Sequence, residues 1–89
     1  MTYRIKSGFI LRTIGNQNMA IPVGKRTTDI HGMIALSESG VLLWKALAEG
    51  ADTDTLVRAL TDEYEIDEMT ARNDVMKFLD GLREQGALE

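Results

Sequence analysis

The sequence predicts an α+β fold in which a three-stranded antiparallel sheet is followed by three helices. Up to Leu36, short runs rich in β-branched and aromatic residues alternate with polar turn clusters, as in a small sheet. From Ser37 onward, apolar residues recur every three or four positions, the pattern of helices with one buried face. The 89 residues suffice for one modest core, so we expect a single domain over residues 1–89.

The expected strands cover residues 9–14, 19–23 and 30–36. Gly15 and the polar residues after it favour a turn that brings the second strand back antiparallel to the first. Pro22 has no N–H to donate to a neighbouring strand. We therefore expect it near the end of its strand, at a bulge, or with its nitrogen directed away from a neighbour. A second polar turn, at residues 24–28, leads into the third strand.

The expected helices cover residues 38–48, 54–64 and 68–85. Ser37 is a typical N-cap for the first helix, because its hydroxyl can accept hydrogen bonds from amides of the first turn. Gly50 separates the first two helices, and Gly86 suits the left-handed residue that commonly ends a helix such as the third. A helix, a short turn and a longer helix beside a small sheet predict a winged helix-turn-helix-like arrangement.

The most specific motif spans the junction between the sheet and the helices. Leu36-Ser37-Glu38-Ser39-Gly40 runs from an apolar strand into a capped helix that also contains Trp44. The last helix carries Ala71-Arg72-Asn73-Asp74-Val75-Met76-Lys77-Phe78-Leu79 and is followed by Gly86-Ala87-Leu88. With these motifs in this order, the chain resembles the PqqD-like family, the RiPP recognition elements that bind precursor peptides for modifying enzymes.

The resemblance implies a protein that binds a peptide without catalysing a reaction. Members of the family bind the leader region of a ribosomally synthesised precursor peptide as an added strand beside the third strand. The peptide lies in the groove between that strand and the third helix, and it is presented to a modifying enzyme such as a radical-SAM protein. An unpaired strand edge suits this role, because its amides and carbonyls can pair with an extended peptide. The expected peptide-binding edge comprises Asp29, Ile30, His31, Gly32, Met33, Ile34 and Ala35.

The register of the third strand decides which of its groups face the peptide. A one-residue shift would exchange the groups that face the ligand with those that face the domain. A proline at Ile34 is therefore expected to weaken binding only if the amide of that residue faces the peptide.

The third helix offers two flanks beside its buried stripe, on a projection of 100° per residue. Asp74 and Gln85 lie on one flank. On the other flank and at its edge lie the residues that we expect to bind the peptide, which are Arg72, Met76, Leu79 and Arg83. Spacing alone leaves open which flank faces the strand, and the family resemblance favours the second. That flank would give an adaptable apolar floor and two guanidinium groups suited to an acidic leader peptide.

The composition argues against catalysis. The chain has no cysteine and one histidine, His31, with Asp29 two residues away on the same face of the expected strand. Two such residues make neither a complete metal site nor a nucleophile with its base. The sequence also has no glycine-rich phosphate-binding motif. We therefore expect no enzyme activity, no metal and no cofactor. Without a secretory signal or a membrane-spanning apolar run, we expect a cytoplasmic protein with no membrane partner.

Two alternative functions stay open. A winged-helix DNA-binding regulator would need a coherent basic face, whereas the third helix mixes basic with acidic residues. The net charge is −4, with five basic and one acidic residue in residues 1–36 and five basic and thirteen acidic residues in residues 37–89. We therefore expect no nucleic-acid partner. A homodimeric scaffold that pairs through the third-strand edge is the other alternative, because an exposed edge invites self-association.

Overall fold

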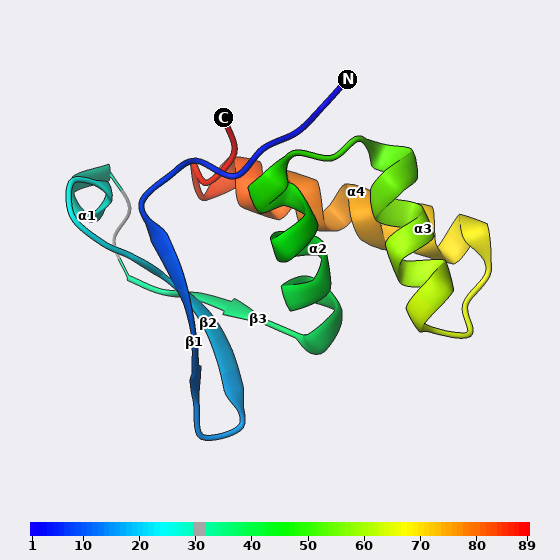
Figure 1. Ribbon diagram of the computed structural model, residues 1–89, viewed down its shortest axis with the longest axis horizontal. Coiled ribbons are helices and arrows are strands. Elements are labelled where there is room, and N and C mark those ends of the chain that lie inside the picture. Colours follow the sequence, from blue (N-terminus) through cyan, green and yellow to red (C-terminus); the bar gives the residue numbers. More distant parts are fainter. Residues whose placement is uncertain (30–31) are drawn as a thin grey trace.

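The chain forms its sheet in the first half and its three long helices in the second (Figure 1). A computed structural model describes residues 1–29 and 32–89. The sheet has the order β1-β2-β3 with antiparallel neighbours, which confirms the predicted α+β class. The elements are β1 Phe9–Ile14, β2 Gln17–Pro22, α1 Arg26–Asp29, β3 Ile34–Leu36, α2 Glu38–Glu49, α3 Thr53–Glu63 and α4 Glu68–Glu84.

The three long helices begin where polar side chains satisfy their first amides. Ser37 accepts a hydrogen bond from the amide of Gly40 at 3.1 Å, at the start of α2. Asp52 caps α3 and Asp67 caps α4, each accepting from the amide three residues later at 2.8 and 2.7 Å. Such caps offset the cost of the unpaired amides in a first helical turn. The observed helix bounds lie within one residue of the predicted ones.

The third strand is shorter than predicted. It spans Ile34–Leu36 instead of residues 30–36. Ala20 pairs with Ile34, so the same register, continued, would set Pro22 against Gly32. Pro22 has no N–H to donate across this pair, and Gly32 leaves the extended region with a φ of 89°. The ladder therefore ends at Ile34, and Pro22 is the last residue of β2.

A short helix takes the place of the polar turn expected at residues 24–28. The hydroxyl of Thr27 donates to the carbonyl of Gly24 at 2.7 Å, and that of Thr28 donates to the carbonyl of Lys25 at 2.8 Å. These bonds to preceding carbonyls hold the backbone in a helical turn that becomes α1. Ile30 and His31, which belong to the predicted third strand, lie outside the described residues.

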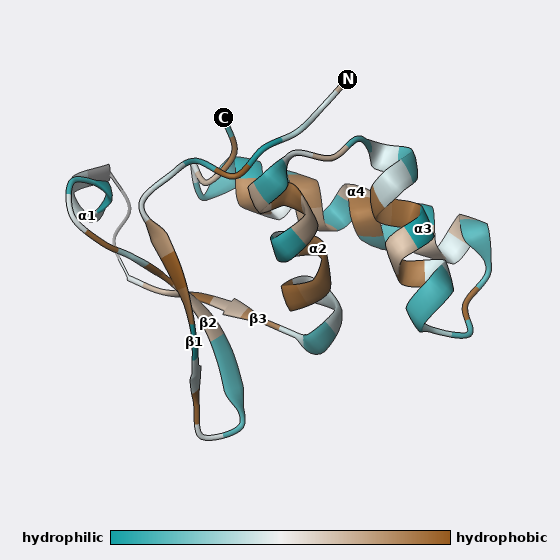
Figure 2. Ribbon diagram, viewed as in Figure 1, coloured by the Kyte–Doolittle hydropathy of each residue, from teal (hydrophilic) through white to brown (hydrophobic). Residues whose placement is uncertain are grey.

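The core forms where the inner face of the sheet meets α2 and where the long helices meet each other. Phe9 of β1 packs edge-on against Trp44 of α2, with ring centroids 5.2 Å apart. Figure 2 shows hydrophobic residues on the facing sides of α2 and α4. The fully buried large side chains are Leu47, Leu56, Leu60, Val75 and Leu79. Interdigitation of these side chains fixes the helices relative to the sheet.

Segments from the two ends of the chain pair with each other. Ile5 forms an isolated antiparallel bridge with Leu88, and Tyr3 forms one with Ala51, just after α2. The amide of Lys6 donates to the carbonyl of Ala87 at 2.8 Å. Figure 1 shows both ends of the chain on the side of the domain opposite the β1–β2 turn.

We expect Leu47→Ala to lower the free energy of unfolding by about 2–5 kcal/mol, because it removes a fully buried side chain and leaves a cavity. Urea denaturation followed by circular dichroism measures this change. Met69→Ala is the matched control: its side chain is 75% exposed, and the expected change is within about 0.5 kcal/mol. Equal effects of the two substitutions would contradict the position of the core.

The capping carboxylates should also make stability depend on pH. Hydrogen bonds from the side chain and backbone of Thr55 hold the pKa of Asp52 below its ordinary 3.8, and those from the backbone and side chain of Thr70 do the same for the pKa of Asp67. A carboxylate with a lowered pKa in the folded state stabilises the fold above the unfolded-state pKa and loses this effect as the pH falls through the folded-state pKa.

Asp67→Asn keeps an oxygen that can cap α4 but removes the titration. We expect its melting temperature to fall less than that of the wild type between about pH 5 and about pH 2. Thermal melts at a series of pH values test this, and parallel curves for the two proteins would count against the contribution of Asp67. Asp67→Ala, which removes the cap as well, should melt below the Asn variant at neutral pH.

Candidate functional site

The hydrogen-bond pattern of β2 determines which backbone groups of the sheet face outward. The amide of Val23 donates to the carbonyl of Gly8 at 2.8 Å, immediately beyond the Phe9–Pro22 pair. Gly8 and Val23 are thus a hydrogen-bonded pair. In an antiparallel ladder, hydrogen-bonded and non-hydrogen-bonded pairs alternate, so the next pair, Phe9 and Pro22, is non-hydrogen-bonded. Ala20 and every second residue of β2 therefore direct their backbone groups away from β1 and toward β3.

This pattern leaves Ala35 as the outward-facing residue of β3. Ile34 pairs with Ala20 and Leu36 pairs with Asn18, so both direct their amides and carbonyls toward β2. Ala35 lies between them and directs its N–H and C=O toward the free edge. The amide of Ile34 faces β2, so a proline there would damage the sheet itself instead of reporting on a ligand.

The aromatic ring of Phe78 lies beside the end of β3. A Cβ atom added to Gly40 would come within 3.3 Å of Cε1 of Phe78 and 3.5 Å of Cβ of Leu36. Gly40 thus allows α4 to approach the junction between β3 and α2, and the ring is only partly buried there. The α4 flank that carries Phe78 is therefore the one turned toward β3.

An open cavity of about 410 Å³ continues from this junction, since Ser37 follows β3 directly. Apolar side chains from the end of α3 form one part of its lining, and the start of α2 and Asp74 of α4 form the polar part. The lining residues are Ser37, Glu38, Ser39, Leu60, Tyr64, Ile66 and Asp74. The cavity can accept an apolar side chain beside a cationic one, because its charged groups are carboxylates.

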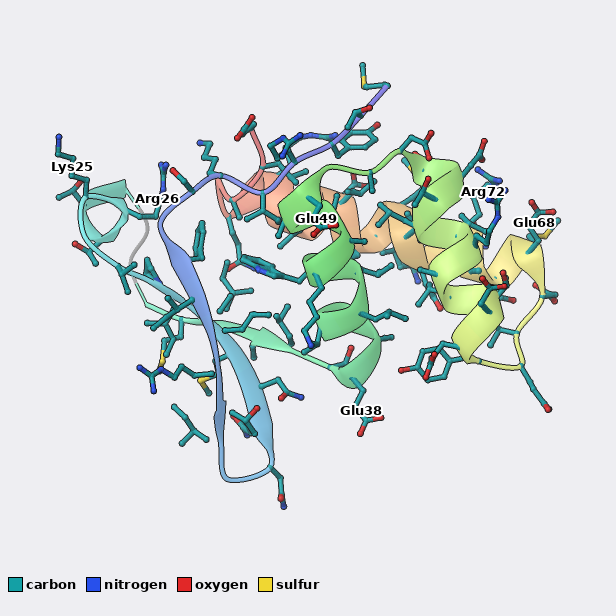
Figure 3. All side chains as sticks on the ribbon, viewed as in Figure 1. Lys25, Arg26, Glu38, Glu49, Glu68 and Arg72 are labelled. Carbon is teal, nitrogen blue, oxygen red and sulfur yellow. The ribbon has the colours of Figure 1, made fainter. Side chains whose placement is uncertain are left out.

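Arg72 lies against α3, away from β3. Its guanidinium contacts Oδ1 of Asp54 at 3.1 Å and Oε1 of Glu68 at 3.4 Å. The hydrogen bond to Asp54 raises the pKa of Arg72, so the guanidinium stays charged. Figure 3 shows Arg72 beside the first turn of α3, and Glu38 on the other side of the helices, where the chain enters α2. The open cavity of about 680 Å³ that Arg72 lines is thus remote from the strand edge.

The other residues expected on α4 are also not gathered beside β3. Leu79 is fully buried in the core. Arg83 pairs with Asp80 of its own helix at 3.2 Å. Met76 is 41% exposed and shares the helical phase of Arg72 and Arg83, not that of Phe78. The structure places Phe78, on the Asp74 flank, near Gly40 and Leu36 at the junction of β3 and α2, whereas the family resemblance favoured the opposite flank for the peptide.

The residues expected on the strand edge differ in their surroundings. Asp29 ends α1, and Gly32 and Met33 precede β3, where the side chain of Met33 is 54% exposed. Ile34 is buried with its side chain in the core, and Ala35 is exposed. Only Ala35 among these combines an exposed side chain with outward-facing strand backbone.

The sequence contained signals for the missed residues. Gly40 and Phe78 both belong to the quoted motifs, and Phe78 shares the helical flank of Asp74. A small residue in the first turn of a helix often marks the close approach of another element. What spacing could not supply was the pairing of Gly40 with Phe78 across the fold.

The described residues offer no assembled metal centre. They contain no buried polar or charged side chain and no cluster of three His, Cys, Asp or Glu residues that could hold a metal ion. In the same part of the chain, no helix is both long and apolar enough to cross a membrane.

Comparison with known proteins assigns the family. The model of the family described as Coenzyme PQQ synthesis protein D (PqqD) matches residues 25–88. The chain belongs to the PqqD family. Within this PqqD-family protein the match covers α1, β3 and the three long helices, which together hold the outward edge at Ala35, the ring of Phe78 and the cavity beside Asp74.

A solved structure shares the fold of this PqqD-family protein. It is described as "TbiB1 in Complex with the TbiA(beta) Leader Peptide" and has a TM-score of 0.75 at 23% sequence identity. The similarity covers 97% of this chain and 94% of that chain. No curated protein matches the sequence.

Proposed function

We propose that this PqqD-family protein binds the leader region of a ribosomally synthesised precursor peptide by strand addition and presents it to a peptide-modifying enzyme. The observation that carries the proposal is the outward-facing backbone of Ala35. The next residue, Leu36, and the partly exposed ring of Phe78 both approach Gly40. TbiB1 shares the fold of this chain, and its structure is described as a complex with a leader peptide, which supports this choice of ligand. The protein itself contributes affinity and effective concentration, and no chemistry.

The short edge limits how much affinity backbone pairing can supply. Ala35 offers one donor and one acceptor, and each hydrogen bond contributes about 0.5–1.5 kcal/mol net. Micromolar binding corresponds to about −8 kcal/mol. Most of the affinity would therefore come from side chains of the peptide that pack against α4 and in the cavity beside Ser37. Phe78 supplies apolar surface there, and the cavity beyond Ser37 can accept an anchoring side chain.

The charges of the groove favour a particular kind of leader. Glu38 and Asp74 line the cavity, whereas Arg72 and Arg83 are engaged in ion pairs elsewhere on the helices. We therefore propose that the bound segment combines an apolar anchor with a nearby Lys or Arg. This replaces the acidic leader that Arg72 and Arg83 would have favoured.

Ala35→Pro should weaken leader binding by about tenfold or more, because it removes the outward N–H and blocks the approach of a partner strand. The measurement is an NMR titration of the isotope-labelled protein with leader segments of the precursor peptides encoded beside its gene. Thr13→Pro is the matched control, since Thr13 faces outward by the same alternation at the β1 edge. It should leave affinity unchanged. Equal affinities of the Ala35→Pro variant and the wild type, with both proteins folded, would refute strand addition at β3.

The two flanks of α4 give opposite predictions. Phe78→Ala should weaken binding of the same peptide by about fivefold or more, because it removes an apolar contact. Asp74→Lys should weaken binding by a similar factor, because it repels a basic residue of the peptide. The double variant Arg72→Gln with Arg83→Gln should bind within about twofold of the wild type, because those side chains face away from the groove. Isothermal titration calorimetry separates the cases, and loss of binding only in the double variant would return the site to the Arg72 flank.

A further inference from the structure

Among the described residues, the long helices pack on the inner face of the sheet, and the opposite face is mostly apolar. Along β1, Phe9 and Leu11 pack against the core, so the alternate residues Ile10, Arg12 and Ile14 lie on the opposite face. Ile10 is 38% exposed and Ile14 is 54% exposed. Large β-branched side chains that remain exposed on a strand require an explanation.

Cross-strand pairing makes this face continuous. Ile10 lies opposite Ile21, and Arg12 lies opposite Met19. Met19 in turn lies opposite Ala35 on β3. Residues paired across an antiparallel sheet contact one another, so the side chains of this face adjoin, with polar Gln17 opposite Ile14 at its end. We call this patch the outer sheet face; it comprises Ile10, Arg12, Ile14, Gln17, Met19, Ile21 and Ala35.

Arg12 is the one charged member of the outer sheet face. It is exposed, and within the described residues its side chain takes part in no hydrogen bond or ion pair. Thirteen of the fourteen acidic residues follow Leu36, outside the strands that form this face. A guanidinium on a mostly apolar face is suited to a carboxylate that approaches with an apolar surface around it.

This charge pattern disfavours a second copy as the occupant. Two copies packed face to face about a two-fold axis through the patch would set Arg12 near its own counterpart, with no carboxylate on either face. Like charges brought together without compensation oppose association. The face therefore fits a different protein, whose contact surface is apolar and carries an Asp or Glu.

We propose that the outer sheet face docks the peptide-modifying enzyme, with Arg12 paired to a carboxylate of that enzyme inside an apolar contact. The choice of partner rests on the proposed function, whereas the position of the docking face does not. Only Ala35 belongs to both surfaces, through its side chain on the outer face and its backbone at the edge. The enzyme can therefore dock while the β3 edge holds the peptide.

The test measures binding of the modifying enzyme encoded beside the gene, by biolayer interferometry on the immobilised domain. Arg12→Glu and the double variant Ile10→Ser with Ile14→Ser should each weaken binding by about tenfold or more. Lys25→Glu makes the same charge change beside α1, outside the patch, and should stay within about threefold of the wild type. The substituted side chains are exposed, and thermal melts check that every variant folds.

Each outcome decides the proposal. Unchanged enzyme binding by both patch variants, or no enzyme binding by the wild type, overturns it. Equal losses for Lys25→Glu and Arg12→Glu would show long-range attraction instead of a contact and would also overturn it. Self-association of the wild type that the Ile10 and Ile14 substitutions abolish would assign the face to a second copy. Leader titrations on the same variants keep the two proposals apart. Loss of enzyme binding with unchanged affinity for the leader supports the docking face. Absence of leader binding with unchanged enzyme binding contradicts only the proposed function.

Discussion

The close approach of α4 to the junction between β3 and α2 is the contact on which the arrangement around the β3 edge depends. Gly40 eases this approach, because a Cβ atom there would lie 3.3 Å from Cε1 of Phe78 and the ring would have to shift by a few tenths of an ångström. With the ring in this position, the flank of α4 that carries Phe78 and Asp74 lies toward the junction. The opposite flank lies toward α3, where Arg72 pairs with Asp54.

A second backbone constraint limits the edge itself. Pro22 cannot extend the β2–β3 ladder, and Gly32 turns the chain away, so β3 presents a single outward residue, Ala35. An edge this short is a poor template for indiscriminate strand pairing. If a peptide pairs with this edge as proposed, its side chains supply the free energy that a longer strand would have supplied through hydrogen bonds.

The helices could be predicted closely because their signals are local. Ser37, Asp52 and Asp67 bond to amides three residues away, so sequence spacing alone identifies them as caps. The length of β3 could not be predicted in the same way, because it depends on the residue opposite each position in β2, here Pro22. The orientation of α4 depends on contacts such as the one between Arg72 and Asp54, eighteen residues apart, which no helical projection contains. The family motifs held the decisive residues without revealing which of them meet.

The pairing of the two chain ends has a consequence for how such a domain can be used. Residues near both termini are tied together through the Ile5–Leu88 bridge, and both ends leave the domain on the side opposite the β1–β2 turn (Figure 1). A polypeptide joined at either end would therefore start from nearly the same point. The domain is therefore suited to fusion at either end of a larger protein, or to insertion within one, without a linker that crosses its sheet.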